Sequence, residues 1–193
     1  MELKPGALSL DELQLIHAGA AGALTLGAAA RAAVRASAAV VQRAARGDAP
    51  VYGVNTGFGK LASTRIGEAD LAALQLNLIR SHSVGVGEPL SPPVVRLMLA
   101  LKAASLARGA SGVREEVVDT LLAVHNAGLV PFVPSQGSVG ASGDLAPLAH
   151  MTLALLGEGE FLVPEPGLAG ALVRRPAAAC LHEAGIAPLT LAA

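Results

Sequence analysis

The segment Gly137–Leu148 has a composition that permits chemistry on its own backbone. Small residues surround Ser142, and Gly143 has no Cβ to hinder its amide nitrogen. In a tight turn this nitrogen can attack the carbonyl carbon of Ala141, and loss of a water molecule closes a ring. Loss of a second water from Ser142 leaves an imidazolinone with an exocyclic methylene. The segment therefore predicts a built-in electrophile, which none of the twenty side chains supplies.

General motifs for other chemistries fit the sequence less well. Residues 57–62 match the loose dinucleotide pattern G-x-G-x-x-A, but no acidic residue follows about twenty positions later and no βαβ unit surrounds them. The same stretch lacks the magnesium-binding Ser/Thr of a phosphate loop, because Leu61 stands there. A serine hydrolase centred on Ser142 is a more distant alternative, because Asp144 occupies the place of the final glycine of a nucleophile elbow.

Three stretches in order along the chain resemble the signatures of the histidine/phenylalanine ammonia-lyase family. Gly137–Leu148 resembles the family segment whose Ala-Ser-Gly tripeptide matures into methylidene-imidazolone (MIO). Val51–Leu61 is similar to the family's tyrosine loop, and Ser81–Gly87 is similar to the loop after its next helix, in the form typical of the histidine enzymes. With matching spacers between them, the resemblance covers essentially the whole chain.

The resemblance assigns roles to individual residues. It implies that Ala141–Gly143 form MIO and that Tyr52 is the catalytic base that removes a proton from the substrate β-carbon. An ordinary tyrosine has a pKa of roughly 10, so this role requires a pKa tuned towards neutral pH. His82 matches the position that contacts the substrate side chain, where histidine favours a polar ring such as imidazole. Asp144 is expected to cap the following helix and to support ring maturation.

The implied reaction is conversion of L-histidine to trans-urocanate and ammonia, without an external cofactor or a metal. The resemblance also implies a homotetramer with active sites shared between subunits. Two alternatives stay open. One is a tyrosine or phenylalanine ammonia-lyase or an aminomutase of the same family, because related tyrosine enzymes also carry histidine at the His82 position. The other is a catalytically incomplete fragment.

The elements that must position these residues are predicted to be mainly α-helical. Hydrophobic residues make up 52% of the chain but aromatic residues only 2%, which favours closely packed helices built from Ala, Leu and Val. Ser9 and Glu12 form a capping-box pattern at the start of the first helix. We expect loops at Pro50–Ser63 and Ala127–Gly143 and a turn-rich Pro164–Pro176. The expected helices run from Ser9 to about Ala18, over Ala28–Arg46, Glu68–Arg80, Pro92–Arg108 and Val113–Asn126, from Asp144 to about Leu156, and from near Ala177.

The resemblance places residues 1–193 as the N-terminal, MIO-bearing part of the ammonia-lyase/fumarase-like helical fold, without most of its central helical bundle. Family chains are more than twice this long. The chain ends in the apolar run Leu189–Ala193, which has no helix cap. We therefore expect a chain truncated at residue 193.

Charge and cysteine content exclude several other classes. Fourteen basic and fifteen acidic residues give a net charge of −1 without a basic run, so we expect no nucleic-acid partner. One cysteine and the lack of a signal-like start predict a cytoplasmic setting. Two uncharged stretches are broken by polar residues and glycines, so no membrane span is expected. We expect Cys180 and His150 to be packed in the core, and we assign no role to Asn55 or Asn77.

Overall fold

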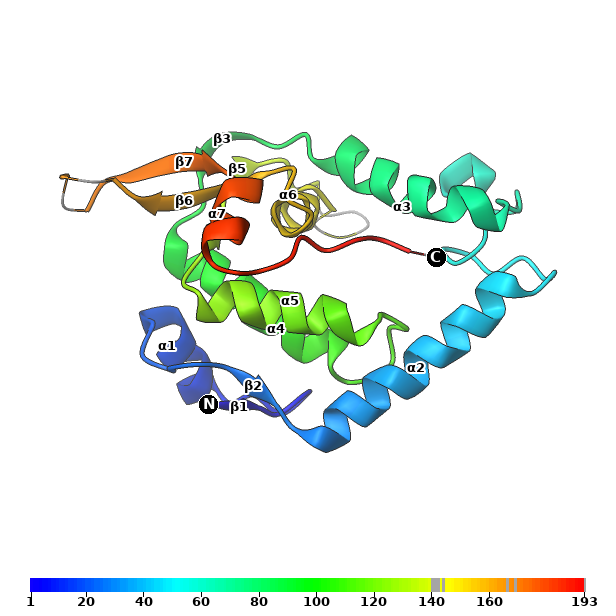
Figure 1. The fold of residues 1–193 in the computed structure, drawn as a ribbon, viewed down its shortest axis with the longest axis horizontal. Helices are drawn as coiled ribbons and strands as arrows, with labels where there is room; N and C mark the ends of the chain where they lie inside the picture. Colours follow the sequence, from blue (N-terminus) through cyan, green and yellow to red (C-terminus); the bar gives the residue numbers. More distant parts are fainter. Residues whose placement is uncertain (140–142, 144, 166, 169, 193) are drawn as a thin grey trace.

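The computed structural model describes residues 1–139, 143, 145–165, 167, 168 and 170–192. They form seven α-helices, one short 3-10 helix and seven short strands (Figure 1). The α-helices are α1 (Leu10–Ala18), α2 (Ala28–Arg46), α3 (Glu68–His82), α4 (Pro92–Leu106), α5 (Glu115–Asn126), α6 (Leu145–Leu155) and α7 (Ala177–Glu183). The strands are β1 (Glu2–Leu3), β2 (Thr25–Leu26), β3 (Val86–Pro89), β4 (Val130–Pro131), β5 (Pro134–Gln136), β6 (Glu160–Pro164) and β7 (Leu172–Pro176).

Helix α4 lies at the centre of the hydrophobic core, with α5 and α1 packed against it (Figure 1). Its side chains Val95, Leu99 and Ala103 are at most 1% exposed. Alanines on several sides of α4 let the neighbouring helices approach closely, so the core is filled without aromatic bulk. The helix predicted over Pro92–Arg108 is confirmed, and it ends two residues earlier, at Leu106.

The first helix begins and ends as its sequence predicts. The Glu12 amide donates to the Ser9 hydroxyl at 3.2 Å, and the Ser9 amide donates to the Glu12 carboxylate at 2.8 Å. These two bonds satisfy amides that the first helical turn leaves free. At the other end Gly19 adopts φ +74°, a left-handed cap that glycine takes without strain. The predicted capping box is confirmed.

A three-stranded antiparallel sheet, in the order β4-β6-β7, corrects one prediction. The prediction that Pro164–Pro176 is turn-rich is wrong at both ends of this stretch. Leu172–Pro176 pair with Glu160–Pro164 as a β-hairpin, which leaves only the stretch between the two strands for the turn. The pairing runs from Glu160 opposite Pro176 to Pro164 opposite Leu172. The stretch expected to be irregular, Ala127–Gly143, likewise contains β4 and β5. These strands of two to five residues are too short to show a clear alternation of polar and apolar side chains.

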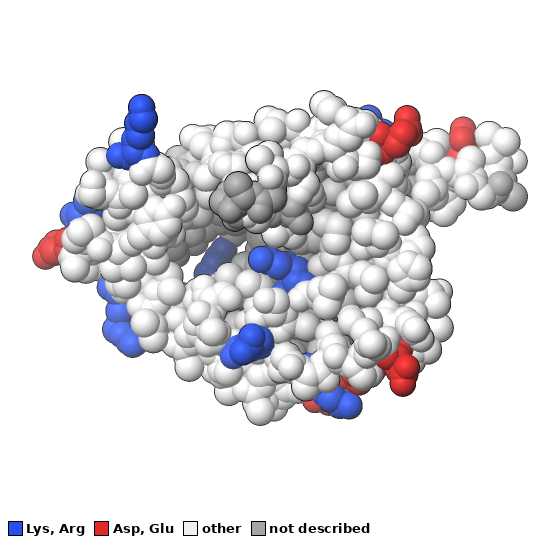
Figure 2. Space-filling model, turned by 180° about the vertical axis from the view of Figure 1, so that it is seen from behind, with Lys and Arg blue, Asp and Glu red and all other residues white. Residues whose placement is uncertain are grey.

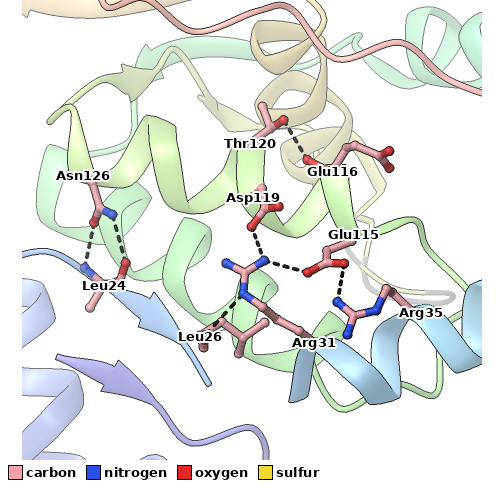
Figure 3. Close-up of polar contacts among 9 residues, drawn as sticks. All are labelled: Leu24, Leu26, Arg31, Arg35, Glu115, Glu116, Asp119, Thr120 and Asn126. Carbon is pink, nitrogen blue, oxygen red and sulfur yellow. Dashed lines mark hydrogen bonds and ion pairs between the residues drawn. The ribbon is translucent and has the colours of Figure 1, made fainter. Parts of the chain in front are cut away.

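Charged side chains fasten the long helix α2 to α5 (Figure 3). Arg31 Nη1 donates to Glu115 Oε1 at 2.7 Å and to Asp119 Oδ1 at 2.8 Å, while Arg35 bonds the second oxygen of Glu115. The bonds to Glu115 and then Asp119 raise the pKa of Arg31, and the bonds from Arg31 and Arg35 lower the pKa of Glu115. From this attachment α2 runs diagonally towards the loop that carries Tyr52 (Figure 1).

Charge is spread thinly over the face of the molecule drawn in Figure 2. On the face drawn in Figure 2, the basic side chains lie singly or in small groups, some of them at a hollow near the centre, and the acidic ones lie towards the edges. None of the described helices is both long enough and apolar enough to cross a membrane.

Candidate active site

A pocket of about 160 Å³ joins the end of α3 to the segments on either side of the predicted tripeptide. From α3 and its following loop come Ser81, His82 and Val84. From the other side come Gly143, which is the last residue of the tripeptide, and the first residues of α6. The full lining is Ser81, His82, Val84, Gly137, Val139, Gly143, Leu145 and Ala146. Two of the residues singled out from the sequence, His82 and Gly143, therefore line the same cavity.

His82 is held at the C-terminus of α3 by its ring nitrogen Nδ1. This atom lies 2.7 Å from the carbonyl oxygen of Leu78 and 3.2 Å from the Ser81 hydroxyl. Because a carbonyl oxygen can only accept, Nδ1 carries the proton in this arrangement. In the neutral ring Nε2 is then left as an acceptor, which suits contact with a donor on a polar substrate ring.

The loop that follows His82 is fastened to α6. The Gly85 amide donates to His150 Nε2 at 3.0 Å, and β3 pairs with β5 next to this bond. A Cβ on Gly137 would lie 2.9 Å from Gly85 Cα, so the two glycine backbones approach more closely than side chains would allow. Burial, with a smaller effect of the Arg174 charge, lowers the pKa of His150 and favours the neutral ring that can accept this bond. His150 lies in α6 as expected but is only half-buried, and it links the two segments that line the pocket.

Tyr52 is not among the described residues that line this pocket. Its side chain is 64% exposed, and its ring meets Phe58 edge-on with centroids 5.7 Å apart. The structure therefore brings His82 and Gly143 together but leaves Tyr52 on a separate, solvent-facing loop.

The residue that organises this loop, Asn55, has no role that the sequence alone predicts. Asn55 is fully buried, and its side-chain amide bonds to the backbone of Ala49 and Val51, just before Tyr52 in the chain. A polar residue within a glycine-rich loop was the only signal in the sequence, and it does not reveal burial.

Ala141, Ser142 and Asp144 lie outside the described residues, so their expected roles rest on the residues beside them. Gly143 adopts φ +107°, in the region that favours glycine, and a Cβ there would meet nothing within 4 Å. Its carbonyl accepts a bond from the Leu145 amide at 3.1 Å. A glycine with an unobstructed Cα, in a backbone conformation that residues with a Cβ rarely adopt, fits the last position of a ring-forming tripeptide. No cluster of metal-ligating side chains occurs among the residues that the structure describes.

The model of the family described as "Aromatic amino acid lyase" matches residues 8–193. The chain belongs to this family. It is 56% identical over 191 residues to histidine ammonia-lyase of Rhodospirillum rubrum, and the match covers 99% of this chain and 36% of that protein. This member of the family thus spans about a third of the length of the curated relative.

Solved structures support the same family fold. Histidine ammonia-lyase from Trypanosoma cruzi matches 99% of this chain and 35% of its own, with a TM-score of 0.86 and 40% identity. Tyrosine aminomutase from Streptomyces globisporus matches 100% of the chain and 34% of its own, also with a TM-score of 0.86 but at 31% identity. The prediction of a mainly α chain with the ammonia-lyase fold is confirmed, and so is the resemblance drawn from the three motifs.

Proposed function

We propose that this chain is the N-terminal, MIO-bearing part of an enzyme that eliminates ammonia from L-histidine to give trans-urocanate. The observation that carries the proposal is its 56% identity, over almost the whole chain, to a histidine ammonia-lyase. The site supports it in two ways. His82 offers a ring acceptor in the pocket, and Gly143 lines the same cavity.

In this proposal the electrophile is MIO, formed from Ala141, Ser142 and Gly143 with loss of two waters. The group supplies an electrophilic methylene carbon to the amine of the substrate. Helix α6 begins two residues after Gly143, so the positive end of its dipole would stabilise negative charge that develops at the tripeptide. Asp144 stands between them and is assigned to helix capping and to support of maturation.

The other roles belong to His82 and Tyr52. His82 orients the imidazole of the substrate through Nε2, while Val84, Val139 and Leu145 present exposed apolar surface at the pocket. Tyr52 takes the proton from the β-carbon. Because Tyr52 lies away from the pocket, we propose that the site is completed by assembly, in a longer cytoplasmic protein whose subunits share active sites in a homotetramer.

Tyrosine or phenylalanine chemistry, including the aminomutase reaction, is the second candidate. It is favoured by one observation, the equally good structural match to tyrosine aminomutase. The lower identity of that match, 31% against 56%, places it behind the histidine reaction.

The proposal is tested by intact mass and by product analysis. The protein should weigh less than its sequence by two waters, with the loss mapping to the peptide that contains residues 141–143, and Ser142→Ala should abolish the loss. The longer enzyme should release urocanate from L-histidine, whereas the 193 residues alone should show little or no turnover. Turnover of L-tyrosine with none of L-histidine would move the assignment to the second candidate. An unmodified mass in the longer enzyme would remove the MIO mechanism.

The role of His82 in selectivity has its own test. His82→Leu removes the ring acceptor and should shift preference away from L-histidine, measured as the ratio of kcat/KM for histidine and tyrosine. An unchanged ratio would remove His82 from the account of selectivity.

A further inference from the structure

The loop that carries Tyr52 is built around one buried amide. Asn55 is 0% exposed although every neighbour from Val51 to Val54 reaches solvent to some degree. Its Oδ1 accepts a bond from the Val51 amide at 2.7 Å. Its Nδ2 lies 3.0 Å from the Ala49 carbonyl oxygen, 3.2 Å from that of Ala44 and 3.4 Å from that of Gly47.

These contacts use both halves of the amide. The three carbonyls belong to the C-terminal end of α2 and the residues just after it, where the regular bonding of the helix stops. The Ala44 carbonyl also accepts from the Gly47 amide, and the Gly47 carbonyl also accepts from Arg65. An amide can donate to them and accept from Val51 at the same time, which neither a carboxylate nor a hydroxyl can do with equal geometry. Asn55 therefore ties the loop to the end of α2.

The backbone around Tyr52 is closed by the same residue. The backbone amide of Asn55 donates to the backbone carbonyl of Val51 at 3.1 Å. The backbone amide of Ile66 donates to the backbone carbonyl of Asn55 at 2.9 Å. Tyr52 lies between Val51 and Asn55, so both ends of its turn are fixed through Asn55 while its side chain remains exposed. Buried polar groups with all their bonds made hold a single arrangement, because each alternative leaves one group without a partner.

We propose that Asn55 is the positioning residue of Tyr52: it fixes the turn that presents the phenol to the substrate. The catalytic meaning of this inference rests on the proposed function, in which Tyr52 is the base. The anchoring itself depends only on the contacts described above. Misplacement of a reacting group by about 1 Å can cost on the order of 100-fold in rate.

The test compares Asn55→Ala with Asn126→Ala. Asn126 is a matched control, because its amide also bridges the backbone of a distant segment, with bonds of 2.7 and 2.9 Å to the amide and carbonyl of Leu24 (Figure 3). It lies at the end of α5 and has no described contact with the Tyr52 loop. Both variants remove one bridging amide, but only the first should release Tyr52.

The first readout needs no catalytic activity. Tyr52 is the only tyrosine of the 193 residues and there is no tryptophan, so the ultraviolet fluorescence of this chain reports on Tyr52. Asn55→Ala should speed the decay of its fluorescence anisotropy, and Asn126→Ala should leave the decay unchanged. Asn55→Asp keeps the shape of the side chain and the oxygen that accepts from Val51, but it replaces the Nδ2 donor with a second oxygen that faces three carbonyl oxygens. This variant should therefore also speed the anisotropy decay at neutral pH. Its anisotropy should recover as the pH is lowered, because a protonated carboxyl can donate.

The second readout is turnover of L-histidine by the longer enzyme. Asn55→Ala should lower kcat by about 10- to 100-fold and change KM by less than about threefold, because Tyr52 acts on the reaction rather than on binding. Asn126→Ala should keep the kcat of the enzyme that carries no substitution. The mass loss of two waters should persist in both variants, which separates positioning from maturation.

Each outcome decides a different claim. Anisotropy that is the same in Asn55→Ala and the unaltered chain would overturn the anchoring. Equal losses of kcat in the two alanine variants would overturn the specific role of Asn55. If Tyr52 is released but the unaltered enzyme does not convert L-histidine, the proposed function fails while the anchoring stands.

Discussion

Replacing His150 with leucine removes the acceptor that holds the loop after His82 against α6. The Gly85 amide, 3.0 Å from His150 Nε2, would lose its partner in a half-buried setting. An amide deprived of its acceptor in this way costs about 1–2 kcal/mol of unfolding free energy. For a chain of this length we expect the Tm to fall by about 2–8 °C. His150→Gln, whose Oε1 can accept the same bond, should lose less.

The difference in stability between the native chain and the His150 variants should depend on pH, in a direction that follows from the pKa of His150. The unfolded chain takes up a proton on His150 as the pH falls through the ordinary value of 6.5, whereas the lowered pKa in the fold delays uptake. The unfolded state then binds more protons, so stability falls as the pH drops below 6.5. The charged groups that share the cavity beside His150 are Arg174 on β7 and the carboxylates Glu158 and Glu160. His150→Gln does not titrate, so the native chain should lose its advantage over this variant between pH 8 and pH 5.

The assay combines thermal unfolding with hydrogen exchange. Circular dichroism gives the Tm of each variant at several pH values, and mass spectrometry gives the exchange of the peptide over residues 83–89. The control is His125→Gln, because burial also lowers the pKa of His125 but its side chain has no described bond to this loop. His125→Gln removes a histidine whose pKa is lowered in the fold, so it should reduce the pH dependence of the Tm. It should leave the hydrogen exchange of residues 83–89 unchanged. Unchanged loop exchange in His150→Leu would refute the reasoning.

Three further predictions concern the scaffold. Arg31→Ala should lower the Tm more than Arg35→Ala, because Arg31 bonds two carboxylates and its side chain is 31% exposed, whereas that of Arg35 is 59% exposed. The difference in Tm between the two variants should shrink in high salt. Gly112→Ala should cost more than about 1 kcal/mol in urea unfolding, because Gly112 has φ +71° and the new Cβ would lie 2.1 Å from Val41 Cγ2. Adding Val41→Ala should restore part of that loss. Leu99→Ala should cost about 2–5 kcal/mol in the same assay, because Leu99 is 1% exposed in the centre of the core.

Specific results would contradict these expectations. Equal Tm losses in the two arginine variants would mean that Arg31 does not fasten α2 to α5. A double variant no more stable than Gly112→Ala would show that the contact with Val41 is not the cause. A loss below about 1 kcal/mol in Leu99→Ala would mean that the core around α4 collapses into the space left behind.

The sequence by itself determined the family, the helices and the identity of the candidate residues. Helix caps and helical periodicity are local, so Ser9, Glu12 and the apolar run of α4 predict their elements without knowledge of the partners. The ring closure proposed for Ala141–Gly143 is equally local, because it would require only adjacent residues. The strands of the β6-β7 hairpin were missed because pairing, rather than propensity, stabilises such short segments.

Only the tertiary structure decided which of these residues meet. It placed His82 and Gly143 in one pocket, left Tyr52 on an exposed loop, and showed Asn55 and His150 to be the anchors of the two loops. A sequence motif names a side chain, but burial and hydrogen bonding depend on segments that are distant in the chain. The amide of Asn55 has its role because the end of α2 leaves carbonyl oxygens beside it, and His150 has its role because Gly85 and Gly137 allow two backbones to approach.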